Sequence, residues 1–203
     1  MADSDTPQIY LVSPPEIELS RFADVLARVL DTREVACLRL SLATREEERL
    51  VRAADAVREV TAARDVALVI AEHVGLAERL GLDGVHLAGA RGVRAAREAL
   101  GADAIVGAHC GASRHDGMNA GEAGADYVAF GPVSGPDLGD GTLAPRELFG
   151  WWSEMIELPV VAEGGLDEDT VRTLWDVTDF FAFGEEIWGA EDPAARLGEL
   201  IGA

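Results

Sequence analysis

Short apolar segments alternate with longer amphipathic segments along the whole chain. Runs of four to eight residues that are rich in Val, Ile, Leu and Phe are typical of buried strands. Eight such runs cover residues 9–13, 35–42, 66–70, 84–87, 104–110, 127–130, 159–162 and 180–184. The chain therefore predicts eight strands, each separated from the next by a segment of different periodicity.

The segments between these runs place apolar residues every three or four positions, which predicts amphipathic helices. The second of them begins with Glu46, Glu47 and Glu48, as the helix dipole favours at an N-terminus. The expected helices cover residues 18–31, 44–63, a segment that ends near 81, 93–100, 113–124, 148–156, 168–175 and 193–201.

Apolar strands that alternate with helices predict a parallel sheet whose outer face is covered by helices. Eight such units in 203 residues correspond to a small (β/α)8 TIM barrel, and we expect a single α/β domain over residues 1–203. A doubly wound open sheet is the alternative, although it usually has fewer strands. In a barrel, the functional residues lie at the C-terminal ends of the strands and in the loops that follow.

The charge of the chain limits the classes of function. Its formal net charge is −20, and all 17 basic residues are arginines. Binding of nucleic acid through its phosphates requires a basic surface, so we expect no nucleic-acid partner. The absence of lysine excludes Schiff-base chemistry and a lysine clamp for phosphate. A strongly acidic surface is typical of a solubility adaptation.

Other features of the composition indicate a cytoplasmic protein. No apolar run approaches the roughly 20 residues that a membrane helix needs. The first residues, MADSDTPQ, are polar and acidic and do not resemble a secretory leader. Cys37 and Cys110 do not form a disulfide framework. We expect no membrane partner, and a homo-oligomer remains open.

Five stretches, in this order, carry a resemblance: CLRL, GLDGVHL, AGADYVAFGPV, LPVVAEGGL and GAEDP. With them the sequence resembles the thiamine phosphate synthase family, which includes the TenI-like thiazole tautomerases. The resemblance implies a TIM barrel that joins a pyrimidine pyrophosphate to a thiazole phosphate with the assistance of Mg²⁺. The partner that it implies is a small phosphate of the thiamine pathway, or an analogue.

Several positions depart from the pattern of this family. Arg39 matches its arginine near the end of the second strand, whereas its lysine position is Ser41. The third strand ends in Ala71 and Glu72 where the family has Asn-Asp, so Glu72 is the candidate magnesium ligand. Arg91 stands where the family has a second magnesium aspartate. A cation there conflicts with coordination of Mg²⁺ by two carboxylates, so the metal remains an open candidate.

The loop after the sixth strand begins with Gly131 and Pro132 and continues as VSGPDLGDG. In the family, this loop carries threonines and a lysine that hold pyrophosphate. Here two aspartates, Asp137 and Asp140, stand among glycines. Gly131 and the other glycines let backbone N–H groups approach a ligand, but no fixed cation assists them. The alternative is a surface loop that has lost its function.

A second candidate subsite follows the seventh and eighth strands, where barrels of this type bind phosphate through backbone N–H groups. The glycines that fit this role are Gly164, Gly165 and Gly184. Three carboxylates adjoin them: Glu163, Glu185 and Glu186. If these carboxylates face the subsite they repel a bound dianion, and if they face solvent they only cap the helix.

His109 is the best general acid/base candidate, because it ends the fifth strand and has a reference pKa near neutrality. A tautomerase of the TenI type needs only proton transfers. Its histidine is expected at the position of Pro132, so His109 would act from another side of the mouth. His109, Cys110, His115 and Glu72 can also be combined into a zinc site, although their spacing matches no structural zinc pattern.

Three functions therefore stay open. The first is a synthase with a rebuilt site, in which Arg39 and backbone amides hold phosphate, Glu72 binds magnesium and Arg91 replaces the missing lysine. The second is a metal-independent acid/base enzyme that uses His109. The third is a non-catalytic ligand-binding or regulatory barrel. We expect His86 to point into the barrel and to satisfy a buried hydrogen bond.

Overall fold

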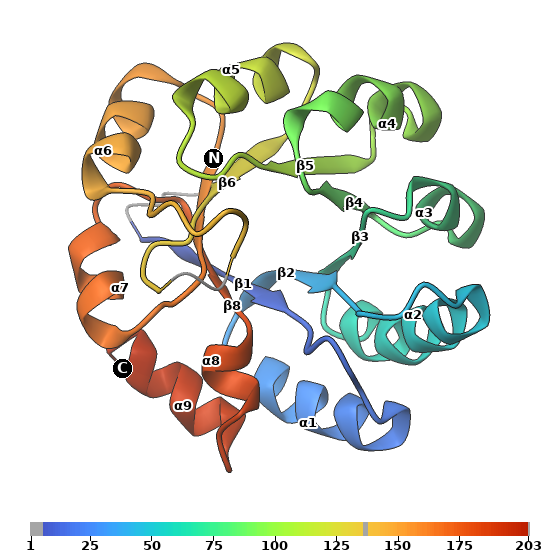
Figure 1. Ribbon diagram of the computed structural model, residues 1–203. Coiled ribbons are helices and arrows are strands. Elements are labelled where there is room, and N and C mark those ends of the chain that lie inside the picture. The colour runs from blue at the N-terminus through green and yellow to red at the C-terminus, as the bar shows by residue number, and fades with distance from the viewer. Residues whose placement is uncertain (1–5, 136–137, 203) are drawn as a thin grey trace.

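The computed structural model describes residues 6–135 and 138–202, and its centre is a closed barrel of eight parallel strands (Figure 1). The strands follow one another around the barrel in chain order, and β1 pairs with β8 to close it. They are β1 (Gln8–Val12), β2 (Val35–Leu40), β3 (Ala67–Ala71), β4 (Gly84–Leu87), β5 (Ile105–His109), β6 (Tyr127–Phe130), β7 (Val160–Glu163) and β8 (Phe180–Phe183). The predicted (β/α)8 barrel is confirmed, and the alternative of an open sheet is wrong.

Helices surround the ring of strands (Figure 1). They are α1 (Leu19–Thr32), α2 (Glu47–Ala62), α3 (Val74–Leu80), the 3-10 helix η1 (Ala90–Gly92), α4 (Val93–Leu100), α5 (Arg114–Glu122), α6 (Arg146–Met155), α7 (Glu168–Leu174), α8 (Glu185–Trp188) and α9 (Pro193–Leu200). The sequence pattern predicts the long helices to within a few residues. It does not predict α8, because a helix of four residues is too short to show a periodicity.

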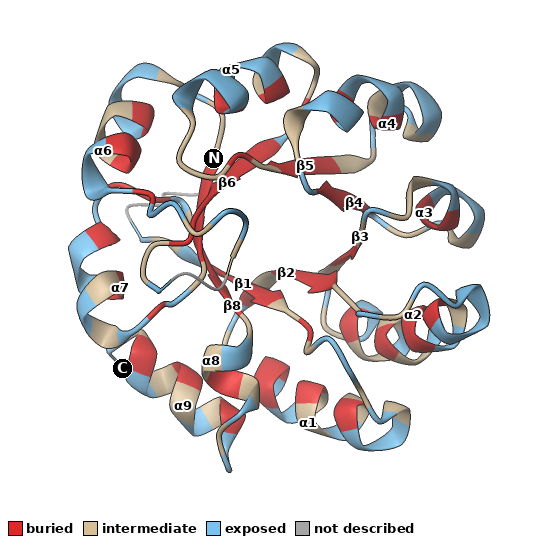
Figure 2. Ribbon diagram, in the orientation of Figure 1, coloured by how far each residue is buried: buried red, intermediate tan, exposed pale blue. Residues whose placement is uncertain are grey.

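The main core lies between the strands and the outer helices. Figure 2 shows buried residues on the sides of the helices that face the barrel, and exposed residues on their outer sides. In α1 the buried residues are Phe22, Leu26, Val29 and Leu30, at the spacing of one helical face. Burying each such side chain contributes about 1.5–3 kcal/mol, so this face holds the helix on the barrel.

A smaller core fills the inside of the barrel and includes Tyr10 and Tyr127. Their hydroxyl groups share a hydrogen bond of 2.8 Å, and the hydroxyl of Tyr127 is 2.9 Å from Nδ1 of His86. The expected inward position of His86 is therefore confirmed. The ring of Tyr127 needs a glycine beside it, because a Cβ on Gly107 would lie 2.0 Å from its Cζ.

A helix that spans a membrane needs roughly 20 predominantly apolar residues. Within residues 6–135 and 138–202, none of the helices is both long and apolar enough to cross a membrane.

Candidate functional site

Three charged or titratable side chains from different strands meet at the C-terminal end of the barrel. Nη2 of Arg39, on β2, donates to Oε2 of Glu163, on β7, at 2.7 Å. Nδ1 of His109, the last residue of β5, donates to Oε1 of Glu163 at 2.7 Å. Arg39 is 7% exposed and Glu163 is 3% exposed. The closed barrel brings together residues that are far apart in the sequence, and Glu163 connects the other two.

The electrostatics of this trio make Glu163 a stable anion. Its burial opposes ionisation, but the charge of Arg39 and the hydrogen bond from His109 hold the pKa of its carboxyl well below the usual range. Burial alone would lower the pKa of Arg39, and the charge of Glu163 raises it instead. Arg39 and Glu163 are therefore an ion pair at neutral pH, and the charge of the arginine is compensated within the protein.

The pairing with Glu163 also orients His109. An ionised carboxylate only accepts hydrogen bonds, so Nδ1 carries the proton and Nε2 of the neutral ring is left as an acceptor. Nε2 is buried and has no hydrogen-bond partner among the residues that the structure describes. A Cβ on Gly139 would lie 3.2 Å from it. His109 thus presents Nε2 toward the loop after β6, beside a cavity of about 450 Å³ that Asp140 also lines.

Backbone N–H groups from two loops converge on a single carboxylate after β7 and β8. Oε1 of Glu186 accepts hydrogen bonds from Gly165 N–H at 3.0 Å and Leu166 N–H at 3.2 Å. Oε2 accepts one from Gly184 N–H at 2.7 Å. Gly164 and Gly165 have φ values of 82° and 78°, a conformation that favours glycine and turns these N–H groups toward one point. We call the N–H groups of Gly165, Leu166 and Gly184 the N–H cradle.

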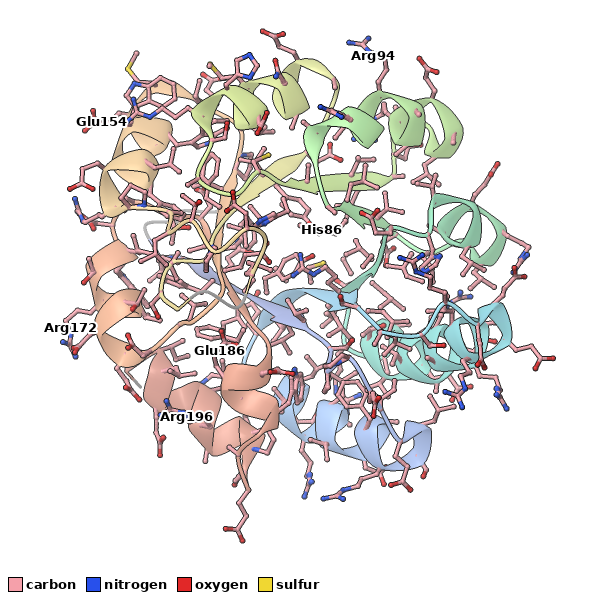
Figure 3. The ribbon with its side chains drawn as sticks, viewed as in Figure 1. His86, Arg94, Glu154, Arg172, Glu186 and Arg196 are labelled. Carbon is pink, nitrogen blue, oxygen red and sulfur yellow. The ribbon has the colours of Figure 1, made fainter. Side chains whose placement is uncertain are left out.

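The two glutamates of α8 behave differently, which the sequence left open. Glu186 is partly buried and occupies the N–H cradle, whereas Glu185 is exposed. Figure 3 shows Glu186 beside α8, and His86 within the ring of strands. Glu185 lines the adjoining cavity of about 320 Å³ together with Arg39, Glu163 and Leu138. The role predicted for Glu185 in ligand binding stays a prediction.

The loop after β6 packs across the loop after β7. Ser134 N–H donates to Gly164 O at 3.1 Å, and Oγ of Ser134 donates to Gly165 O at 2.6 Å. Gly131 N–H donates to Gly111 O at 3.1 Å, so this N–H group is not available to a ligand. A Cβ on Gly131 would lie 2.1 Å from Glu163 O, so this position has no room for a side chain. Asp137, predicted in this loop, lies outside the described residues.

Glu72 and Arg91 lie on another side of the mouth. Glu72 follows β3 with φ 65°, is exposed, and accepts a hydrogen bond from Ala88 N–H after β4. Its carboxylate therefore joins two neighbouring loops. Arg91 lies in η1 and is exposed. Within the described part of the chain, it makes no ion pair with Glu72 or Glu163.

The family pattern implies magnesium held by carboxylates at the positions of Glu72 and Arg91. One oxygen of Glu72 is engaged by Ala88 N–H, and Arg91 stands on the neighbouring loop where a second carboxylate would be needed. In the described ranges, no group of three or more His, Cys, Asp or Glu side chains is placed to hold a metal ion. These residues do not fit coordination of Mg²⁺ by two carboxylates.

The alternative zinc site is not assembled either. His115 is exposed on α5, where its Nδ1 is 3.1 Å from Nδ2 of Asn119. Cys110 is buried, and burial raises the pKa of its thiol to about 12. The thiol of Cys37, inside the barrel, also has its pKa raised to about 12 by burial. A thiol with a raised pKa is a poor nucleophile, and neither cysteine belongs to a group of three candidate metal ligands in the described ranges.

Sequence reasoning did not single out Leu166, Ser134, Tyr10 or Tyr127. Leu166 contributes its backbone N–H, which no side-chain pattern indicates. Tyr10 and Tyr127 come from strands on different sides of the barrel, and only the closed fold brings their hydroxyl groups together.

Comparisons with known proteins agree with this architecture. The family described as thiamine monophosphate synthase (TMP-TENI) matches residues 9–185. A thiamine-phosphate synthase of Rhodospirillum centenum is 41% identical, over 95% of this chain and 95% of its own. A thiamine-phosphate synthase of Erythrobacter litoralis is 38% identical, over 96% and 95%.

A solved structure gives the same fold. Thiamine phosphate pyrophosphorylase from Pyrococcus furiosus superposes with a TM-score of 0.82 and 22% identity, over 95% of this chain and 93% of its own. At that identity the likeness concerns the fold alone. The sequence matches, together with the closed barrel, show that the chain belongs to the thiamine monophosphate synthase family.

Proposed function

We propose that the protein is a transferase of the thiamine-phosphate synthase type, which joins a pyrimidine pyrophosphate to a thiazole phosphate and releases pyrophosphate. Its family and its relatives named thiamine-phosphate synthase support this function. The observation that carries it is the N–H cradle, in which three backbone donors meet on one carboxylate. Clusters of this kind bind phosphate oxygens, and TIM barrels use this end of the molecule for that purpose.

In this proposal the cradle binds the phosphate of the thiazole substrate. Arg39 lines the adjoining cavity and keeps its guanidinium in place through Glu163. A fixed cation at that position favours a second anionic group nearby, such as the leaving pyrophosphate. Because the carboxylates present do not fit a two-carboxylate Mg²⁺ site, we assign no step to the metal.

The test is an assay of the purified protein with both substrates, with and without Mg²⁺, in which thiamine phosphate is quantified by mass spectrometry. We expect product from the wild type and a strong loss in Arg39→Lys, because a single ammonium cannot reproduce the geometry of a guanidinium. Arg64→Lys is the matched control, because Arg64 pairs with Asp31 on the outer surface. No product at high enzyme concentration, in either metal condition, would contradict the transferase.

A second candidate function rests on a different observation, the hydrogen bond between His109 and Glu163. A histidine held at Nδ1 by a carboxylate, with Nε2 unpartnered, has the geometry of a general base that can return its proton as a general acid. We propose that such a site moves a proton between two positions of a thiazole-type substrate. The reaction is an isomerisation, so it needs no co-reactant.

This candidate is tested by exchange of substrate protons for deuterium in D2O, followed by NMR. Loss of a general base costs about 10²–10⁴-fold in rate, so His109→Ala is expected to lose exchange by a factor in that range. His115→Ala, on the exposed face of α5, is the control and is expected to exchange at the wild-type rate. Equal rates of deuterium exchange in both variants would contradict the acid/base role of His109. Saturable ligand binding without turnover of either kind would instead indicate a non-catalytic barrel.

A further inference from the structure

The carboxylate of Glu186 is bound in the way that a ligand would be. Both of its oxygens accept hydrogen bonds, one from Gly184 N–H and the other from Gly165 and Leu166 N–H. The neighbouring Glu185 is exposed, although it has the same side chain and lies in the same helical turn. The position of Glu186 therefore reflects the N–H cradle and not a general preference for acidic residues at a helix start.

An ordinary helix cap does not explain this contact. A capping side chain accepts N–H groups from the first turn of its own helix. Glu186 lies within α8, and two of its three donors, Gly165 and Leu166, belong to the loop after a different strand, β7. The side chain thus reaches from one loop to another, across the place where a phosphate would bind.

The same cavity contains a second group that is short of a partner. Arg39 lines the cavity with Glu186 and is 7% exposed. Its Nε is buried and has no hydrogen-bond partner within the described ranges. A buried donor without an acceptor is costly, and an incoming ligand with anionic oxygens would satisfy it.

We propose that Glu186 is a built-in competitor for the phosphate subsite, so that its carboxylate and the phosphate of the substrate exclude each other from the N–H cradle. This inference rests on the proposed function, in which the cradle receives a substrate phosphate. Each N–H group has one proton to donate, so two anions cannot use the same three donors. Binding of phosphate then requires Glu186 to leave, and release of phosphate allows it to return.

The competition sets how tightly the site holds phosphorylated ligands. It keeps the cradle hydrogen-bonded when no ligand is present, so the N–H group of the buried Leu166 is not left unsatisfied. It also lowers the affinity for phosphate without removing any of the donors. Glu186 therefore tunes the affinity of the site for phosphorylated ligands and favours release of a phosphorylated product over retention.

The rest of α8 is held in place independently of this carboxylate. Ile187 is fully buried, and Nε1 of Trp188 donates to Val12 O at 2.6 Å. The ring of Trp188 also packs edge to face with Phe22, at 5.2 Å between centroids. Shortening Glu186 should thus empty the cradle without displacing the helix.

The test measures the dissociation constant of inorganic phosphate by calorimetry, at fixed ionic strength, in the full-length protein. We expect Glu186→Ala to bind phosphate at least about tenfold more tightly than the wild type, which corresponds to about 1.4 kcal/mol. Glu191→Ala removes an equal charge from the exposed segment after α8, outside the cavity that Glu186 lines, and is expected to change the constant by less than about threefold, because solvent screens that charge. Glu186→Asp keeps the charge but is one methylene shorter, so its affinity should lie closer to that of Glu186→Ala.

Equal changes in Glu191→Ala and Glu186→Ala would overturn the proposal, because charge alone would then explain them. Failure of every variant to bind phosphate would overturn it as well. If Glu186→Ala does not fold, as judged by its thermal transition, Glu186→Gln replaces it and is expected to bind more tightly than the wild type. The transferase assay is independent of this result. If Glu186→Ala binds phosphate more tightly but the wild type forms no thiamine phosphate, only the proposed reaction is contradicted.

Discussion

Glu163 determines what the other polar groups at the mouth of the barrel can do. It uses one oxygen for Arg39 and the other for His109. The charge of Arg39 is therefore compensated internally, whereas its Nε and Nε2 of His109 have no hydrogen-bond partner within the described residues. The sequence predicted these three residues separately, each at a strand end. It did not predict their pairing, because which strand ends face each other depends on closure of the barrel.

Removing the charge of Glu163 should destabilise the fold. Glu163→Gln leaves Arg39 buried and charged without a counterion, and breaking a buried pair in this way costs about 3–5 kcal/mol. The measurement is the free energy of unfolding in urea. Glu46→Gln is the control, because its ion pair with Arg49 is largely exposed and should contribute far less. Similar losses in both variants would contradict the buried ion pair.

His86 should make the stability of the protein depend on pH. Burial, assisted by the charge of Arg39 and opposed by that of Glu163, lowers the pKa of His86 well below its usual value. The unfolded chain takes up a proton below about pH 6.5, whereas the folded protein does not. The contribution of His86 is therefore fully present above that pH and is lost as the pH falls.

The corresponding measurement is urea unfolding of the wild type and His86→Gln between pH 7.5 and 5, a range that spans the reference pKa of histidine at about 6.5. We expect the free energy of unfolding to fall less steeply with decreasing pH in the variant, because glutamine does not titrate. Parallel pH profiles for the two proteins would show that His86 takes up its proton equally in both states.

At the scale of elements, periodicity predicts the strands and the long helices because each has a consistently buried face. The burial pattern of β4, β6 and β7 is continuous, as expected for strands covered on both sides. The approach of α8 to the loop after β7 could not be predicted in the same way. This approach requires that β7 and β8 be neighbours in the barrel and that the side chain of Glu186 extend to the loop after β7. Both conditions depend on the tertiary structure.

Two glycines allow a matched test of packing within these elements. Gly107 on β5 lies under the ring of Tyr127, so Gly107→Ala should overpack the inside of the barrel and cost about 1–3 kcal/mol. Gly75 in α3 has open space around it, so Gly75→Ala should stabilise the helix by up to about 1 kcal/mol. Thermal unfolding of the two variants measures the difference. An unchanged thermal transition in Gly107→Ala would show that the ring of Tyr127 is free to move.

The whole molecule combines an acidic composition with the anion site that we propose at the mouth of the barrel. With a net charge of −20, its field opposes the approach of phosphate, although salt screens that field beyond about 8 Å. In the proposed function, the N–H cradle and Arg39 would supply the donors that the missing lysines would have supplied. Composition predicted the field, and the alternation of apolar strands with amphipathic helices predicted the barrel. Only the folded chain shows the carboxylate of Glu186 inside the cradle.

The most direct measurement is a calorimetric titration of the wild type and Glu186→Ala with thiamine phosphate, in the presence of pyrophosphate and Mg²⁺. We expect saturable binding to both proteins, with the tighter binding in Glu186→Ala, because a phosphate then meets an empty cradle. No heat at millimolar ligand with either protein would contradict a phosphate site at the mouth of this barrel.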